Sequence, residues 1–129
     1  MVISFSSEKP RQQLLDKKYV YTFRKNRRKA FIKAARHYWR MPLKNWGHKD
    51  WANEGRTKPK MCDVIIFEVG DLVLKNLEKY VLGSGFEDLE EWGQEIARLN
   101  GWDEPRVHDK GWLYKVIWAP EEEEKSEWT

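Results

Sequence analysis

A strongly basic stretch between Lys17 and Arg40 carries the residue types that bind phosphate. It holds ten lysines and arginines, one histidine, six aromatic side chains and no acidic residue. Lysine and arginine neutralise phosphates and release condensed counterions, which gives affinity for nucleic acid without sequence preference. Aromatic rings placed among them can stack on bases. The stretch therefore predicts a nucleic-acid-binding surface, with RNA as the expected partner and DNA also compatible.

The charge of the chain is unevenly distributed around this stretch. Residues 1–49 carry 14 basic and 2 acidic side chains, whereas residues 50–129 carry 10 and 19. The formal net charge of +3 hides this asymmetry. The length of 129 residues fits a single domain. We expect that domain to span 1–120, followed by a flexible acidic tail over 121–129.

Hydrophobic periodicity indicates an α+β fold. Strands are predicted where apolar and polar residues alternate or where β-branched residues concentrate. The predicted strands are 2–5, 19–24, 62–69, 71–82 and 112–119. Part of 71–82 can also be helical. Helices are predicted after Ser6 or Ser7, over 26–40 and over 88–100, where Asp88 and Glu91 form a capping-box pattern. Residues 42–60 are expected to be a long polar loop. Mostly sheet, with helices at its edges, favours a small barrel-like domain.

The predicted helix over 26–40 has an apolar face and a cationic face. Phe31, Ala34, Ala35 and Tyr38 share one side, and Lys29, Lys33, Arg36 and Arg40 share the other. Such a stripe is often only the solvated side of an amphipathic helix. Here no acid stands at i,i+4 to pair the cations, so they repel one another. The cationic stripe is easier to explain if phosphates of a nucleic acid neutralise it than if it only faces solvent.

Three further residues have two readings each. Trp46 and Trp51, in the predicted loop, either pin that loop to the body of the protein or present stacking platforms. Glu68 stands on an otherwise apolar strand face. It is either a strand-end glutamate with one exposed edge or a carboxylate in a functional site.

Other features limit the class of protein. The single cysteine, Cys62, excludes an intramolecular disulfide, and no cluster has metal-ligand spacing, so we expect neither a metal nor a cofactor. No apolar run is long enough to span a bilayer or to act as a signal peptide, so a cytoplasmic location is expected. Charged residues make up 35% of the chain, as in thermophile proteins rich in surface ion pairs.

Three segments of the chain carry a family resemblance. The opening ISFSSEKPRQQLLDKKYVYTFR, the middle segment WANEGRTKPKMCDVIIFEV and the later GFEDLEEWGQEIARLNGW together resemble the ASCH domain of the PUA-like superfamily, above all its small archaeal members. The most specific piece is Gly85-Phe86 leading into the helix that contains Trp92. The resemblance implies a small PUA-like β-barrel flanked by helices, with a cleft that binds RNA.

The cleft signature of that family, G-x-K-x-x-E-x-R, is only partly present. Aligned on Arg24, the first three signature positions are occupied by Lys17, Tyr19 and Thr22. Lys18 lies one residue from the expected lysine and fits only if the strand begins with a bulge.

Some bacterial ASCH proteins are amidohydrolases that act on acetylated cytidine with a lysine, a threonine and a glutamate. The resemblance implies that Thr22, Lys18 and Glu68 would be the catalytic residues if this chain were such an enzyme. A hydroxyl nucleophile needs an adjacent base, and Lys18 is the position where the match fails.

Three functions are therefore carried forward. The first is an RNA-binding module that uses a basic cleft near Arg24 and the basic amphipathic helix, and the second is a nucleoside amidohydrolase. The third is a protein-interaction domain in which the basic and acidic halves of different copies pair. A monomer is the favoured oligomeric state. The predicted nucleic-acid contacts are Lys18, Arg24, Lys25, Arg27, Arg28, Lys29, Lys33, Arg36, Arg40, Trp46, Trp51, Arg56, Lys58 and Lys60.

Overall fold

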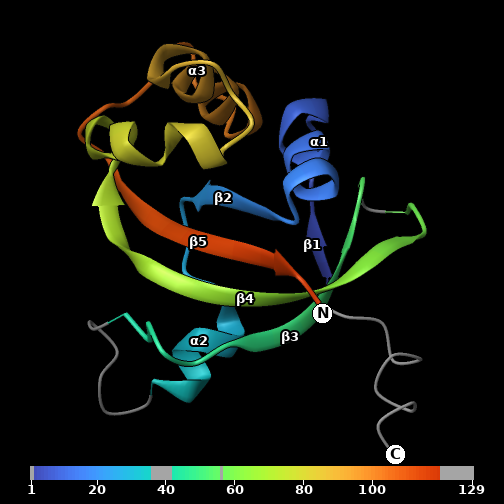
Figure 1. Cartoon of the computed structure of the whole chain (residues 1–129). Coiled ribbons are helices and arrows are strands. Elements are labelled where there is room, and N and C mark those ends of the chain that lie inside the picture. The colour runs from blue at the N-terminus through green and yellow to red at the C-terminus, as the bar shows by residue number, and fades with distance from the viewer. Residues whose placement is uncertain (1, 36–41, 56, 120–129) are drawn as a thin grey trace, which may run out of the picture.

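The computed structural model describes residues 2–35, 42–55 and 57–119 (Figure 1). The predictions made for Arg36, Tyr38, Arg40, Arg56 and the tail over 121–129 lie outside these residues. The elements follow one another as β1 (Val2–Ser4), α1 (Glu8–Lys17), β2 (Tyr19–Arg24), α2 (Lys29–Ala34), β3 (His48–Asn53), β4 (Lys60–Val73), the 3-10 helix η1 (Leu74–Gly83), α3 (Leu89–Leu99) and β5 (Lys110–Trp118).

The strands form one curled sheet in the order β1-β3-β4-β5-β2. β1 runs parallel to β3, and every other neighbouring pair is antiparallel. Figure 1 shows the long β4 bending through the middle of the sheet, with α3 and η1 together beyond one end of β5. The α+β class predicted from the sequence is confirmed, and the curled sheet with its helices is consistent with a small barrel-like domain.

Period-two alternation gives the sheet two buried faces. On one face, Val20 of β2 lies opposite Val116 of β5, which lies opposite Ile66 of β4, and this core receives Leu14 from α1 and Phe31 from α2. On the other face, Phe23 lies opposite Leu113, and this core receives side chains from η1 and α3. The predicted bounds and faces of the strand at 19–24 are confirmed.

The predicted loop over 42–60 contains a strand that the sequence did not indicate. β3, with the sequence HKDWAN, pairs with β1 on one side and with β4 on the other. Its polar residues are used inside the protein: Asp50 pairs with Arg28, and the side chain of Asn53 accepts a hydrogen bond of 2.7 Å from Ser4. This strand forms because it pairs with β1 and β4 and its polar side chains have partners inside the protein, and not because its residues favour strands.

The predicted break at Gly70 is wrong. β4 continues through Gly70 to Val73, because an irregularity between Glu68 and Gly70 absorbs one extra residue as a β-bulge does. The segment after it is η1, which agrees with the alternative that part of 71–82 is helical. Its two buried leucines, Leu74 and Leu77, are three residues apart, a spacing that fits a 3-10 helix better than a strand.

The basic helix begins later than its sequence pattern indicated. Arg28 is extended, with φ −66° and ψ 137°, so α2 starts at Lys29 rather than after Asn26. The backbone N–H of Arg28 donates to the Tyr114 hydroxyl at 2.7 Å, which satisfies it outside the helix. On the predicted apolar face Phe31 and Ala35 are buried, whereas Ala34 is exposed.

The predicted start of the later helix is confirmed. The carboxylate of Asp88 accepts a hydrogen bond of 2.8 Å from the backbone N–H of Glu91, as an N-cap residue does. The Glu91 side chain reaches back to the N–H of Glu87 at 3.0 Å. Among the described residues, we find no helix with the length and apolar character required to cross a membrane.

Candidate nucleic-acid interface

The exposed cations of α2 lie on its outer side. Lys29 and Lys33, four residues apart, are exposed, while Phe31 between them is buried in the core. The chain contains no aspartate or glutamate from residue 17 to residue 49. The two lysines therefore have no acidic neighbour in the sequence around them.

The segment before β3 packs against α2 through an aromatic contact. The Trp46 indole meets the Phe31 ring edge-on, at 5.2 Å between centroids, and stacks on His48 at 5.6 Å. It still keeps 39% of its surface exposed. Trp46 therefore pins its segment to the body of the protein, as one of its two readings predicted, and part of the indole stays accessible. Trp51 is partly buried within β3.

The Trp46–Phe31 contact joins the two segments, and we call their exposed lysines together with the Trp46 indole the basic surface. Lys44, exposed and two residues before Trp46, belongs to it, although the sequence interpretation did not single it out. The sequence did contain a signal for Lys44, because this lysine lies inside the stretch without acidic residues and two positions before Trp46. The basic surface consists of Lys29, Lys33, Lys44 and Trp46.

Arg27, a predicted phosphate contact, turns inward instead. Its guanidinium forms a two-pronged ion pair with the Glu68 carboxylate, with N–O distances of 2.6 and 2.7 Å. The two side chains are only 5% and 0% exposed. The guanidinium also lies over the Trp112 ring, and the backbone N–H of Leu43 donates to Glu68 at 2.8 Å. Glu68 is thus neither an exposed strand-end residue nor a free base, and Arg27 leaves the set of phosphate contacts.

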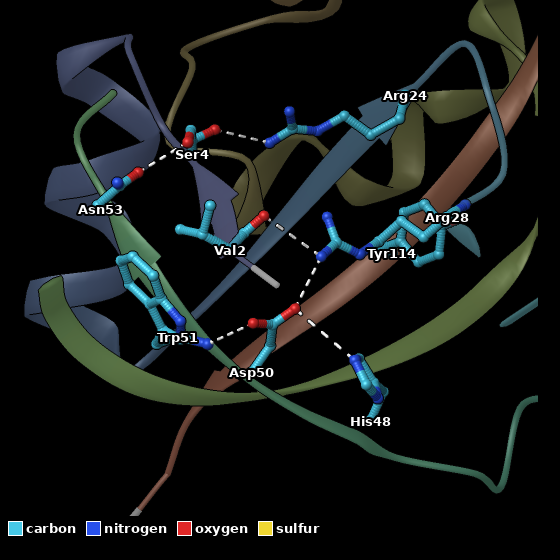
Figure 2. A network of polar contacts seen from close by, with 9 residues as sticks. All are labelled: Val2, Ser4, Arg24, Arg28, His48, Asp50, Trp51, Asn53 and Tyr114. Atoms are coloured by element: carbon cyan, nitrogen blue, oxygen red, sulfur yellow. Dashed lines mark hydrogen bonds and ion pairs between the residues drawn. The ribbon is translucent and has the colours of Figure 1, made fainter. Parts of the chain in front are cut away.

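Arg28 also turns inward. It donates to the Asp50 carboxylate at 2.9 Å and approaches the Val2 carbonyl at 3.5 Å, as Figure 2 shows. The Asp50 side chain is 1% exposed and also accepts from the backbone N–H of Trp51 at 2.9 Å. The ion pair offsets part of the cost of burying the two charges, although the buried Nε of Arg28 has no hydrogen-bond partner among the described residues. Arg28 therefore holds the start of α2 to β3 and β1.

Arg24 reaches the edge of the sheet formed by β1. Its guanidinium donates to the Ser4 carbonyl at 3.0 Å and to the Thr22 hydroxyl at 3.1 Å. Figure 2 shows Arg24 and Arg28 approaching two alternate carbonyls of β1, those of Ser4 and Val2. Burial and then the nearby charge of Arg28 lower the pKa of Arg24 to about 10. The two arginines thus connect β1 with the end of β2, the two edge strands of the sheet.

The three residues that the family resemblance named as catalytic do not converge. Thr22 and Glu68 lie in one row across the sheet, but Tyr114 stands between them. Lys18 lies at the other end of β2, where its ammonium donates to the Leu15 carbonyl at 3.1 Å and sits 3.9 Å from the Trp118 ring centroid. Burial raises the pKa of Tyr114 to about 12, so its hydroxyl stays protonated.

Neither Lys18 nor Glu68 is placed to act as a general base for the Thr22 hydroxyl. Its oxygen accepts a hydrogen bond from Arg24, which stays a cation at neutral pH and cannot take a proton. Incubation with N4-acetylcytidine is therefore expected to release no acetate. Release that disappears in Thr22→Ala would contradict this reading, and chromatography of the nucleoside products measures it.

The remaining predicted contacts lie away from the basic surface. Lys60 pairs with Asp63 at 2.8 Å, and Lys58 is exposed in the turn between β3 and β4. Lys25 is exposed directly after β2. Among the described residues, no group of three histidine, cysteine, aspartate or glutamate side chains is arranged to hold a metal ion.

Comparison with known proteins gives no match for this chain. No family model, no curated protein and no solved structure matches it.

Proposed function

We propose that the chain is a nucleic-acid-binding module, with RNA as its expected ligand, and that its curled sheet is a variant of the ASCH domain of the PUA-like superfamily. The observation that carries the binding proposal is the basic surface. It combines three exposed lysines with an accessible indole, on two segments that contain no acidic residue.

The buried network supports this proposal by fixing the surface in place. Phe31 fills the core beneath α2, and Arg28 holds the start of that helix to β3. Lysines on an anchored helix can contact phosphates at a lower entropic cost than lysines on a mobile loop. Arg27 and Arg28 contribute rigidity rather than phosphate contacts.

Binding to single strands also uses aromatic rings on which bases stack, and the Trp46 indole can supply such a ring. Stacking of a base on an aromatic ring contributes about 1–3 kcal/mol and tolerates any base. Trp46 is already packed against His48 and Phe31, so few of its rotamers are lost on binding. The ligand that fits this combination is an unpaired strand whose phosphates meet lysines while one base meets the indole.

Reversing the two lysine charges on α2 tests the proposal. Lys29→Glu combined with Lys33→Glu is expected to weaken binding of a single-stranded oligoribonucleotide by about tenfold or more at low salt, because two phosphate contacts become repulsive. Gel-shift titration or fluorescence anisotropy measures the change. The same titration with an oligodeoxyribonucleotide compares RNA with DNA.

The chain offers a matched control on the opposite side of the sheet. Lys75 and Lys79 are exposed, are also four residues apart, and lie on η1. Lys75→Glu combined with Lys79→Glu makes the same change in net charge. Equal losses of affinity in the two double variants would show a general charge effect and would contradict the assignment to the basic surface.

A further inference from the structure

One face of the sheet carries apolar side chains that belong to neither hydrophobic core. They are half-buried and lie in two neighbouring rows across the strands, together with two lysines. We call this group the sheet platform, which consists of Phe67 and Lys115 in one row and Lys49, Ile65, Ile117 and Tyr19 in the other.

The helices cover only the neighbouring part of this face. η1 and α3 lie near the start of β5 (Figure 1), where they pack around Phe23 and Leu113, one row further along the strands. η1 ends at Gly83, where a Cβ would clash with the Tyr19 ring. Leu82, at this border, is 92% exposed. Extended exposed apolar surface marks an interaction site.

Among the described residues, the two lysines of the platform have no acidic partner. Lys115 places its ammonium 5.2 Å from the centroid of the Tyr19 ring. Neither Lys115 nor Lys49 forms an ion pair within the described part of the chain. Asp63, on the same face of β4, is paired with Lys60 at 2.8 Å. Both cations of the platform are therefore available to phosphates.

The platform adjoins the basic surface at Gly47. A Cβ on this residue would stand 2.7 Å from Cγ2 of Ile65 and 2.8 Å from the Phe67 ring, so only glycine lets the chain pass this close. Gly47 directly follows Trp46, whose indole belongs to the basic surface. A strand with one base on Trp46 can therefore continue past Gly47 onto the platform.

The width of the platform fits two or three nucleotides. It crosses β3, β4, β5 and β2, which are neighbours in the sheet, and strands lie about 4.8 Å apart, so it is about 14 Å wide. Some RNA-binding sheets stack two or three bases on aromatic side chains of their strands. Here Phe67 and Tyr19 supply the rings, and Lys115 lies on the strand between them.

A second copy of the chain fits this face less well than a nucleic acid does. A symmetric contact places the same patch on both sides, so Lys49 and Lys115 would meet a surface of the same charge. Burying cations without partners is unfavourable. A single strand of nucleic acid supplies both the negative charges and the flat rings that the platform lacks.

We propose that the sheet platform is a second binding segment for single-stranded RNA, continuous with the basic surface. Bases stack on the Phe67 and Tyr19 rings, and phosphates contact Lys49 and Lys115. The inference rests on the proposed function, because the strand reaches the platform from Trp46. It also predicts a preference for unpaired strands, since a duplex hides the faces of its bases.

Oligoribonucleotides of two lengths test this proposal. Lys49→Glu combined with Lys115→Glu is expected to weaken binding of a strand of about twelve nucleotides about tenfold at low salt. Binding of a strand of about four nucleotides should not change, because it does not reach both surfaces. Fluorescence anisotropy measures both affinities. Wild-type affinity for the longer strand, or an equal loss for both lengths, would overturn the proposal.

The same titrations distinguish a failure of this proposal from a failure of the proposed function. Lys29→Glu combined with Lys33→Glu is expected to weaken binding of both strands. If it does so while the platform variant binds both like wild type, the basic surface stands and the platform is overturned. If the wild-type chain binds neither strand, the proposed function fails and the platform fails with it.

Photochemical crosslinking locates the bases without any substitution. The longer strand, carrying 4-thiouridine at every position, is irradiated with the wild-type chain, and mass spectrometry identifies the modified residues. Crosslinks at Phe67 or Tyr19 are expected in addition to those at Trp46. Crosslinks confined to Trp46 would overturn the proposal.

Sedimentation of the chain without nucleic acid tests the competing occupant. A monomer is expected. A dimer that Ile117→Asp converts to a monomer would assign this face to a second copy and overturn the proposal.

Discussion

Replacing Glu68 with alanine is expected to lower the free energy of unfolding by about 3–5 kcal/mol. The substitution leaves the Arg27 guanidinium, only 5% exposed, without its carboxylate. It also removes the acceptor of the Leu43 backbone N–H. Urea denaturation followed by circular dichroism measures the change, with the midpoint and the slope reported together.

A double-mutant cycle separates the lost ion pair from general damage to the core. Glu68→Met combined with Arg27→Met is expected to be considerably more stable than Glu68→Met alone, because the double variant does not bury a guanidinium that has lost the Glu68 carboxylate. Glu90→Ala, at an exposed glutamate of α3, is the control and is expected to change stability by no more than about 0.5 kcal/mol. A Glu68→Ala variant as stable as this control would refute the structural role given to the pair.

Truncation of Phe31 is the second change with a large expected effect. Phe31 is completely buried and contacts the Tyr114 and Trp46 rings at 5.4 and 5.2 Å between centroids. Phe31→Ala is expected to cost about 3–5 kcal/mol in the free energy of unfolding, through lost burial and the cavity left behind. Because Trp46 loses its support, the variant should also bind the oligoribonucleotide more weakly under conditions where it is still folded.

The adjacent residue of the same helix provides the control for this prediction. Ile32 is 48% exposed, so Ile32→Ala is expected to leave both stability and binding nearly unchanged. If Phe31→Ala unfolds at the same urea concentration as Ile32→Ala, α2 is not anchored in the way described here.

Local sequence signals predicted the strands in which apolar and polar side chains alternate and the helix that begins with a capping residue. The strand at 19–24 and the start of α3 at Asp88 follow from neighbouring residues alone. β3 could not be predicted in this way, because its residues are polar and its strand conformation comes from pairing with β1 and β4. The same limit explains the continuation of β4 through Gly70, which requires a bulge that no local pattern marks.

The candidate site, like the fold, could be predicted from the sequence only in part. Lys29, Lys33 and Trp46 are on the surface, as the sequence indicated. Arg27 and Arg28 were predicted to contact phosphates, within a stretch that contains no acidic residue. Their partners, Glu68 and Asp50, are 41 and 22 residues away along the chain. The sequence shows how much charge a segment carries, but only the fold determines which charges face the interior.

A salt titration of oligoribonucleotide binding by the full chain is the most direct test of whether the basic surface binds phosphates. If Lys29, Lys33 and Lys44 each neutralise one phosphate, the logarithm of the association constant should fall with the logarithm of the salt concentration with a slope of about −2. Affinity should therefore decrease by more than about tenfold between 50 and 200 mM salt. Affinity that stays constant over this range would contradict a basic surface that binds nucleic acid through its phosphates.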